Sequence, residues 1–214
     1  TVLKQPLTNI YLVASAVMDM FVSIDALDSI RFSSQKEDGW YIEAAKQEME
    51  AGNIIYAGKY SAPDYEQILS EGCGLAIENT MIYHTPEVKE KLEELGIPVL
   101  VERSSYETHP LGRLEWIKLY GLLFDALDEA NAYFDSQVEQ ITPLLDQANT
   151  GKTVAFFSVN SSGAINVRKP GDYITQMITM AGGNYALADV VPEEENALST
   201  MNMQMEDFYN AAQS

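Results

Sequence analysis

The histidines and their neighbouring glutamates are the residues of this chain best suited to metal chemistry. His84 follows Glu78, and His109 follows Glu107. Imidazole nitrogens and carboxylate oxygens together bind divalent metals such as Zn²⁺ and Mn²⁺. A metal-ion site with His84, His109 and Glu107 among its ligands is therefore one hypothesis for the function. The alternative for His109 is purely local, because it precedes Pro110 and so stands where a helix can begin.

Motifs that would indicate an enzyme are incomplete. The segment 52–60 resembles a phosphate-binding loop, but it has one residue too many between its glycines. It also offers Tyr60 where a magnesium-binding Ser or Thr is needed. The chain has no Gly-x-Ser-x-Gly sequence, which marks the nucleophile of many hydrolases. We therefore predict no catalytic residue, and an α/β enzyme stays the less favoured alternative.

Arg103, Tyr83 and Tyr106 are suited to binding rather than to chemistry. A guanidinium binds carboxylate or catecholate oxygens through paired hydrogen bonds, although a surface ion pair would use the same residue type. Tyrosines offer an apolar ring with a polar tip, which suits a ligand wall and suits a packed edge nearly as well. We interpret these three residues, with His84, as candidate ligand contacts.

The first half of the chain alternates between strand-like and helix-like segments. The predicted strands are 9–14, 30–33, 53–56, 75–78 and 97–102, and the predicted helices are 15–24, 40–51, 64–70 and 86–95. This alternation is typical of a parallel sheet with helices on both faces. Ligands bind such sheets at the carboxyl ends of the strands. Tyr83, His84, Arg103 and Tyr106 all follow a predicted strand.

Apolar residues then recur every three or four positions from Leu111 to Leu145, which predicts a helix over about 110–148. Such a helix would be roughly 57 Å long at about 1.5 Å per residue. Pro143 predicts a kink or a restart there, with Thr142 as the capping residue. We interpret the helix as a strut that joins two lobes, with a coiled-coil arm as the alternative.

The remaining segment predicts a second, smaller lobe. Strands are expected at 152–159 and 165–167, and helices at 172–181 and 205–212. The expected domains are thus 1–109, an inter-lobe helix at 110–149, and 150–214, with a ligand cleft between the lobes. Asn160 and Arg168 follow the two strands and are the candidate ligand contacts of the second lobe. Arg168 would complement an anionic ligand.

Composition limits the partners. Of 214 residues, 46% are apolar, which excludes disorder as the main state. The net charge of −19 would repel nucleic acid and anionic lipid, so neither is an expected partner.

Cys73 is the single cysteine, so a disulfide framework is impossible within one chain and a buried thiol is expected. No apolar run is long enough to span a membrane. No signal peptide is visible in the sequence, and we expect any export signal or lipid anchor to lie outside it.

Four segments carry a resemblance to a known family. They are 71–87, 95–100, 105–121 and 173–184, the last ending in Ala-Gly-Gly-Asn. Their order and spacing resemble the substrate-binding proteins of ABC importers for iron–siderophores, haem and cobalamin. The resemblance implies an α/β fold of two Rossmann-like lobes with mostly parallel sheets, joined by one long helix, with the ligand in the cleft. Family members continue past the segment around 206, so the second lobe is expected to be partial.

The resemblance also implies the function. It implies an extracytoplasmic, monomeric protein that captures a ferric siderophore, haem or cobalamin without catalysis and without an intrinsic cofactor. The partner would be an ABC permease, and the membrane would be touched only through that permease or a lipid anchor. One glutamate on each lobe is implied to dock on the permease, and the matching positions are Glu66 and Glu206. The alternative for each is a carboxylate stabilised by a helix N-terminus.

Overall fold

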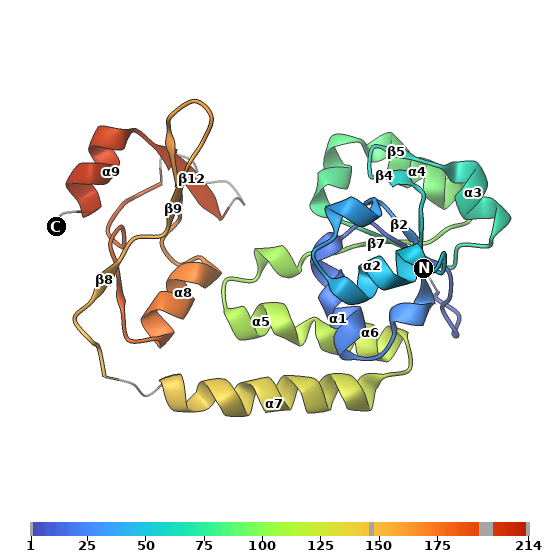
Figure 1. Cartoon of the computed structure of the whole chain (residues 1–214), viewed down its shortest axis with the longest axis horizontal. Coiled ribbons are helices and arrows are strands. Elements are labelled where there is room, and N and C mark those ends of the chain that lie inside the picture. The colour runs from blue at the N-terminus through green and yellow to red at the C-terminus, as the bar shows by residue number, and fades with distance from the viewer. Residues whose placement is uncertain (1, 146–147, 193–198, 213–214) are drawn as a thin grey trace. The chain divides into compact units, whose positions relative to one another are not determined.

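The computed structural model describes residues 2–145, 148–192 and 199–212 (Figure 1). By internal contacts the chain divides into two compact units. Unit 1 comprises residues 1–103 and 115–134, and unit 2 comprises 104–114 and 135–214. The chain therefore enters unit 2 at residue 104, returns to unit 1 at 115, and leaves it again at 135.

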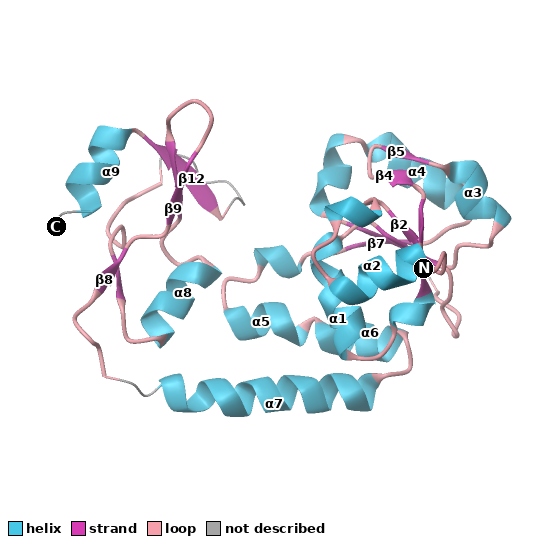
Figure 2. Cartoon of the chain, in the orientation of Figure 1, coloured by secondary structure: helices cyan, strands magenta, loops and turns pink. Residues whose placement is uncertain are grey.

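Unit 1 is built on a five-stranded sheet with the order β3-β2-β1-β6-β7. The strands are β1 (Ile10–Leu12), β2 (Ile30–Ser33), β3 (Ile55–Tyr56), β6 (Ala76–Glu78) and β7 (Val99–Val101). Every neighbouring pair is parallel, and Tyr11 of β1 pairs in register with Ala76 of β6. The predicted α/β class and the predicted parallel sheet are confirmed (Figure 2).

Helices cover both faces of this sheet, as alternating side-chain directions require. Tyr11 and Val13 face one core with side chains from α3 (Tyr65–Ser70) and α4 (Pro86–Glu94). Ile10 and Leu12 face the other core, which includes residues of α1 (Met18–Ser23), α2 (Glu43–Glu50) and α6 (Ile117–Leu123). The two cores fix the strand ends, and so the loops that follow them.

Short elements complete unit 1. They are the 3₁₀ turns η1 (Ser15–Val17), η2 (Leu27–Ser29), η3 (Glu37–Gly39) and η4 (Thr80–His84), and a small hairpin of β4 (Gly58–Lys59) and β5 (Ala62–Pro63). Gly58 has a positive φ of 86°, and a Cβ there would lie 2.3 Å from the carbonyl oxygen of Ala62. This hairpin therefore requires glycine at that position.

The single helix expected over 110–149 is instead three helices. They are α5 (Pro110–Glu115), α6 and α7 (Leu127–Leu145). The chain turns between α6 and α7, where Asp125 has a φ of 58°. A Cβ on Gly121 would lie 2.5 Å from the Cβ of Ala130, so α6 packs closely on the first turns of α7. The restart expected at Pro143 with Thr142 as its cap was wrong, because Pro143 lies inside α7 and the Thr142 hydroxyl donates to the carbonyl of Val138 at 2.7 Å. The alternative, a kink at Pro143, stays a prediction.

The described residues of unit 2 form two small sheets and two helices besides parts of α5 and α7. β12 (Thr200–Met203), β10 (Ile165–Arg168) and β9 (Phe157–Val159) form an antiparallel sheet. β11 (Asn184–Tyr185) and β8 (Thr153–Val154) form a parallel pair. The helices are α8 (Tyr173–Met180) and α9 (Met205–Ala212), and η5 (Ser104–Tyr106) precedes α5.

The sheets of unit 2 differ from the sequence expectation in two ways. The strand expected at 152–159 is two strands, β8 and β9, and each pairs with a different partner. The three-stranded sheet is antiparallel, whereas a mostly parallel one was expected. The buried core of this unit is small and is formed by Ile165, Val167, Tyr185, Leu187 and Phe208. Among the described residues, no helix is long and apolar enough to cross a membrane.

Candidate functional site

The carboxyl end of the unit 1 sheet carries three of the predicted ligand contacts. Tyr83 and His84 lie on η4, which follows β6, and both side chains are exposed. Asn79 caps this turn, because its side-chain oxygen accepts a hydrogen bond from the Met81 amide at 2.9 Å. Arg103 is exposed and follows β7. The sheet therefore presents polar and aromatic groups on neighbouring strand ends, as the sequence predicted.

Glu78 behaves differently from these neighbours, because its side chain is completely buried. It is the last residue of β6, and within the described residues neither carboxylate oxygen has a hydrogen-bond partner. Burial raises the pKa of Glu78 from 4.5 to about 8. The Glu78 charge in turn helps to raise the pKa values of Tyr11 and Tyr65, after burial itself. Glu78 is thus a core residue whose carboxyl group is not available to a ligand in solvent.

The metal-ion hypothesis receives no geometric support from the part of the chain that the structure describes. In those residues, no three His, Cys, Asp or Glu side chains come together in a group that could hold a metal ion. His109 has the local role that was the alternative, since its Nδ1 accepts a hydrogen bond from the Leu111 amide at 3.2 Å. That contact satisfies a free donor in the first turn of α5.

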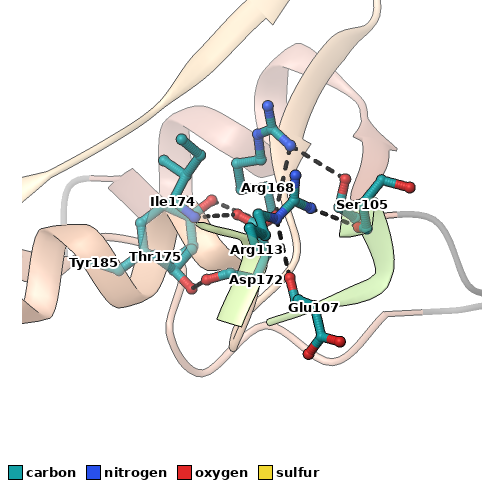
Figure 3. A network of polar contacts seen from close by, with 9 residues as sticks. Ser105, Glu107, Arg113, Arg168, Asp172, Ile174, Thr175 and Tyr185 are labelled. Carbon is teal, nitrogen blue, oxygen red and sulfur yellow. Dashed lines mark hydrogen bonds and ion pairs between the residues drawn. The ribbon is translucent and has the colours of Figure 1, made fainter. Parts of the chain in front are cut away.

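Unit 2 brings two arginines, Arg113 and Arg168, close to Asp172 at the start of α8 (Figure 3). The guanidinium carbon of Arg113 lies 3.6 Å from the centre of the Tyr173 ring. Two backbone carbonyls hold this guanidinium, since Nε donates to Glu107 at 3.0 Å and Nη2 to Ser105 at 2.5 Å. These three contacts fix the orientation of the Arg113 side chain against the ring.

Arg168 supports the same ring from the end of β10. Its guanidinium carbon lies 5.4 Å from the centre of the Tyr173 ring, and Nη1 donates to the hydroxyl of Ser199 at 3.1 Å. Nη1 of Arg168 also forms an ion pair with Oδ2 of Asp172, at 3.5 Å. That oxygen makes no hydrogen bond within the described residues. The other oxygen of Asp172 caps α8 by accepting from the Ile174 amide at 2.9 Å.

These groups border a cavity of about 280 Å³, which we call the charged pocket. Its lining includes the side chains of Tyr106, Glu107, Arg113, Lys169, Asp172 and Tyr173. Two tyrosine rings offer stacking surface, and Arg113 and Lys169 offer positive charge. Glu107 and Asp172 in the same lining balance these two cations, so the pocket is suited to a small planar group that has both charged and hydrogen-bonding atoms.

The predicted ligand contacts that lie in unit 2 are found at two different places. Tyr106 was expected in the first lobe, but residues 104–114 belong to unit 2, where Tyr106 lines the charged pocket. Arg168 lies against the Tyr173 ring that also lines it. Asn160 lies at the tip of the β9–β10 hairpin, where its side-chain oxygen accepts from the amides of Ser162 and Ala164, both at 3.0 Å. The oxygen of Asn160 thus shapes the turn.

Arg113 and Tyr173 were missed as site residues. Both lie in segments that resembled the importer family, at 105–121 and 173–184, so the signal was present. Neither residue directly follows a predicted strand, where the ligand contacts were expected. Only the packing of 104–114 against the loop before α8 brings Arg113 onto the ring of Tyr173.

The two glutamates expected to dock on a partner lie at comparable positions. Glu66 and Glu206 are exposed and stand in the first turns of α3 and α9. Asp64 caps α3 by accepting from the Gln67 amide at 3.0 Å, which leaves Glu66 outside the capping contact. Both glutamates gain stabilisation from the helix N-terminus, so the local explanation and the docking explanation both remain.

A comparison with known sequences gives one informative relative. The chain is 23% identical over 222 residues to an uncharacterised lipoprotein of Methanocaldococcus jannaschii. That alignment covers 99% of this chain but 51% of the relative, so the chain spans about half of that protein's length. No family model matches the chain.

Solved structures share the fold more widely. A periplasmic binding protein of Veillonella parvula matches with a TM-score of 0.76 at 14% identity, over 98% of this chain and 69% of its own. The periplasmic haem-binding protein HutB of Vibrio cholerae matches with a TM-score of 0.73 at 17% identity. The match covers 95% of this chain and 73% of HutB. The periplasmic vitamin B12-binding protein BtuF of Vibrio cholerae matches with a TM-score of 0.61 at 16% identity. The match covers 96% of this chain and 74% of BtuF. The mixed α/β fold is therefore that of periplasmic solute-binding proteins.

Proposed function

We propose that this chain belongs to an extracytoplasmic solute-binding protein that captures an iron chelate and delivers it to an ABC permease. The observation that carries the proposal is the fold, which is shared over 95% of the chain with a haem-binding protein. The charged pocket adds support, because Tyr173 suits a planar ligand and Arg113 can bind a carboxylate or catecholate group of it, beside the carboxylates of Glu107 and Asp172. The relative that is a lipoprotein supports an extracytoplasmic location and a lipid anchor.

The ligand would be a ferric siderophore, haem or a corrinoid such as cobalamin. Tyr83, His84 and Arg103 would contact it from unit 1, and Tyr106 and Arg168 from unit 2. Asn160 would reach it through its amide nitrogen, because the turn occupies its oxygen. Capture needs no catalytic group and no resident cofactor.

Isothermal titration with ferric catecholate and hydroxamate siderophores, haem and cobalamin tests the proposal. We expect one class to bind without turnover and Arg113→Gln to weaken that binding by about tenfold, because a charged contact to the ligand is lost. Lys152→Gln is the matched control, since Lys152 is an exposed cation of the same unit. If none of these compounds binds, the proposal fails; if one is converted to a product, the enzyme alternative replaces it.

Delivery would use Glu66 and Glu206 as carboxylates that pair with basic residues of the permease. Charge reversal by Glu66→Lys is expected to abolish ligand-stimulated ATP hydrolysis by the reconstituted importer while ligand affinity stays unchanged. Glu90→Lys on α4 provides the control, because Glu90 is equally an exposed helical glutamate of unit 1. Equal loss of activity in both variants would mean that net charge matters, and Glu66 would have no specific docking role.

A further inference from the structure

A second cavity of unit 2, of about 320 Å³, has a lining without charged residues. Its polar side chains are Asn149, Thr175, Gln176, Thr179, Asn184 and Tyr185, and its other lining residues are Gly, Pro and Ala. We call it the neutral pocket. Its volume lies in the range of about 300–1,000 Å³ that is typical of small-molecule sites. The contrast with the charged pocket is informative, because the chain as a whole is 21% charged.

The lining selects against two kinds of ligand. An ion would lose hydration on entering and would find no opposite charge among the lining residues. An apolar ligand would cover amide and hydroxyl groups and leave them without hydrogen bonds, which is also unfavourable. A neutral molecule with many hydrogen-bonding groups avoids both costs.

Local contacts hold part of the lining in place before any ligand arrives. The Asn149 amide donates to the side-chain oxygen of Asn184 at 2.6 Å, and the Asn149 oxygen accepts from the Gly151 amide at 2.7 Å. The Thr179 hydroxyl donates to the carbonyl of Thr175 at 3.1 Å. These bonds direct the nitrogen of Asn184 to act as a donor and leave the Thr179 oxygen able to accept.

Gln176 supplies both functions from the same helix. Within the described residues its side-chain amide forms no hydrogen bond, so its oxygen and its nitrogen are both available. Tyr185 is not available in this way, because its hydroxyl donates to the carbonyl of Arg168 at 2.7 Å. The free groups are therefore amide donors and acceptors together with a hydroxyl acceptor.

From this inventory we infer that the neutral pocket binds an uncharged polyhydroxylated molecule, of the sugar or cyclic polyol class. Each hydroxyl of such a molecule both donates and accepts, which matches side-chain amides and Thr179. The inference does not depend on the proposed transport function, because it uses a pocket with different polar side chains.

Titration of the whole chain with glucose and myo-inositol, followed by NMR of the side-chain amides, tests the inference. We expect saturable shifts at Gln176 and Asn184. We also expect binding of glucuronate and protonated glucosamine to be weaker by about tenfold, since their charges have no partner here. Absence of saturable shifts with both neutral probes, or equal affinity for the charged ones, would overturn the inference.

Two substitutions locate the binding. Gln176→Leu and Thr179→Val are each expected to weaken glucose or inositol binding by about fivefold to tenfold, because each removes one hydrogen-bonding group. Thr153→Val on β8 is the matched control and should leave the affinity unchanged, since Thr153 is exposed and outside the pocket. Arg113→Gln should also leave it unchanged. If Gln176→Leu and Thr179→Val bind as tightly as the unsubstituted chain, the site is elsewhere and the inference is wrong.

Discussion

Unit 1 buries both faces of its sheet, whereas unit 2 leaves a strand of its sheet exposed. In unit 1, Ile10, Leu12 and Ile77 are each 0% exposed and belong to one core, while Tyr11 and Ala76 belong to the other. In unit 2, every residue of β9 is exposed. The ring centres of Phe157 and Phe208 lie 4.6 Å apart at the margin of a small core.

The comparison indicates that each unit is stabilised internally by a different kind of interaction. Unit 1 depends mainly on burial of apolar surface. Unit 2 places a larger share of its organisation in polar contacts of Arg113, Arg168 and Asp172, which position the loop before α8. A binding site built on oriented polar groups is consistent with the second arrangement.

Loss of a core side chain should have the largest effect on stability. Ile77→Ala removes most of a fully buried side chain from the interior strand β6, and it should lower the free energy of unfolding by about 2–5 kcal/mol. Val159→Ala on β9 should change it by less than about 0.5 kcal/mol, because Val159 is 56% exposed. Urea denaturation followed by circular dichroism measures both. Similar losses for the two variants would show that β9 is packed in solution and would break the comparison.

The buried carboxyl of Glu78 should make unit 1 sensitive to pH. The folded-state pKa is raised to about 8, so between about pH 4.5 and pH 8 the unfolded chain has released this proton and the folded chain has kept it. The free energy of unfolding therefore falls as pH rises through this window, by at most about 1.4 kcal/mol per pH unit, and this contribution levels off above it.

Glu78→Gln removes that dependence, because the amide does not ionise. Relative to the unsubstituted chain, the variant should become progressively more stable from pH 5 to pH 8. Thermal unfolding at several pH values checks this, with Glu90→Gln as the control because Glu90 is exposed. If the difference between Glu78→Gln and the unsubstituted chain is constant across the range, Glu78 is ionised in the folded state.

Two aspartates that cap helices provide the finest test of the comparison. Asp64 is exposed and caps α3 of unit 1, whereas Asp172 is buried, caps α8 of unit 2 and also pairs with Arg168. Asp64→Ala should cost about 1 kcal/mol. Asp172→Ala should cost more, about 2 kcal/mol, because it also leaves the Arg168 guanidinium without its carboxylate.

Chemical denaturation of the two alanine variants measures this difference. Asp64→Asn and Asp172→Asn are useful controls, because asparagine keeps the capping oxygen and removes only the charge. Equal costs for Asp64→Ala and Asp172→Ala would mean that the polar contacts around Arg168 contribute little to unit 2.

Most elements of unit 1 could be predicted from the sequence, because local signals specify them. Asp64 before α3 and Pro86 at the start of α4 are start signals that need no tertiary context. The strand at 30–33 appears as predicted. The break between α6 and α7 could not be found in this way. It depends on the close approach of Gly121 to Ala130, and helical spacing continues across it.

Unit 2 was harder to predict because its strands are short and its pairings are not local. A continuous apolar run at 152–159 does not reveal that β8 pairs with β11 and β9 with β10. β11 and β12 were not predicted, since two to four residues carry too little periodicity. The ligand cleft and the candidate contacts of both units stay predictions that binding experiments must test.

The sequence by itself determined the α/β class, the parallel pairing of the strands in unit 1 and the loops that carry Tyr83, His84 and Arg103. These features follow from side-chain alternation and capping residues, which act over a few positions. The tertiary structure alone decided that Arg113 lies on Tyr173, that Glu78 is buried with no hydrogen-bond partner among the described residues, and that a neutral pocket lies beside α8. Such features depend on segments far apart in the chain meeting in space, and no local pattern encodes which segments meet.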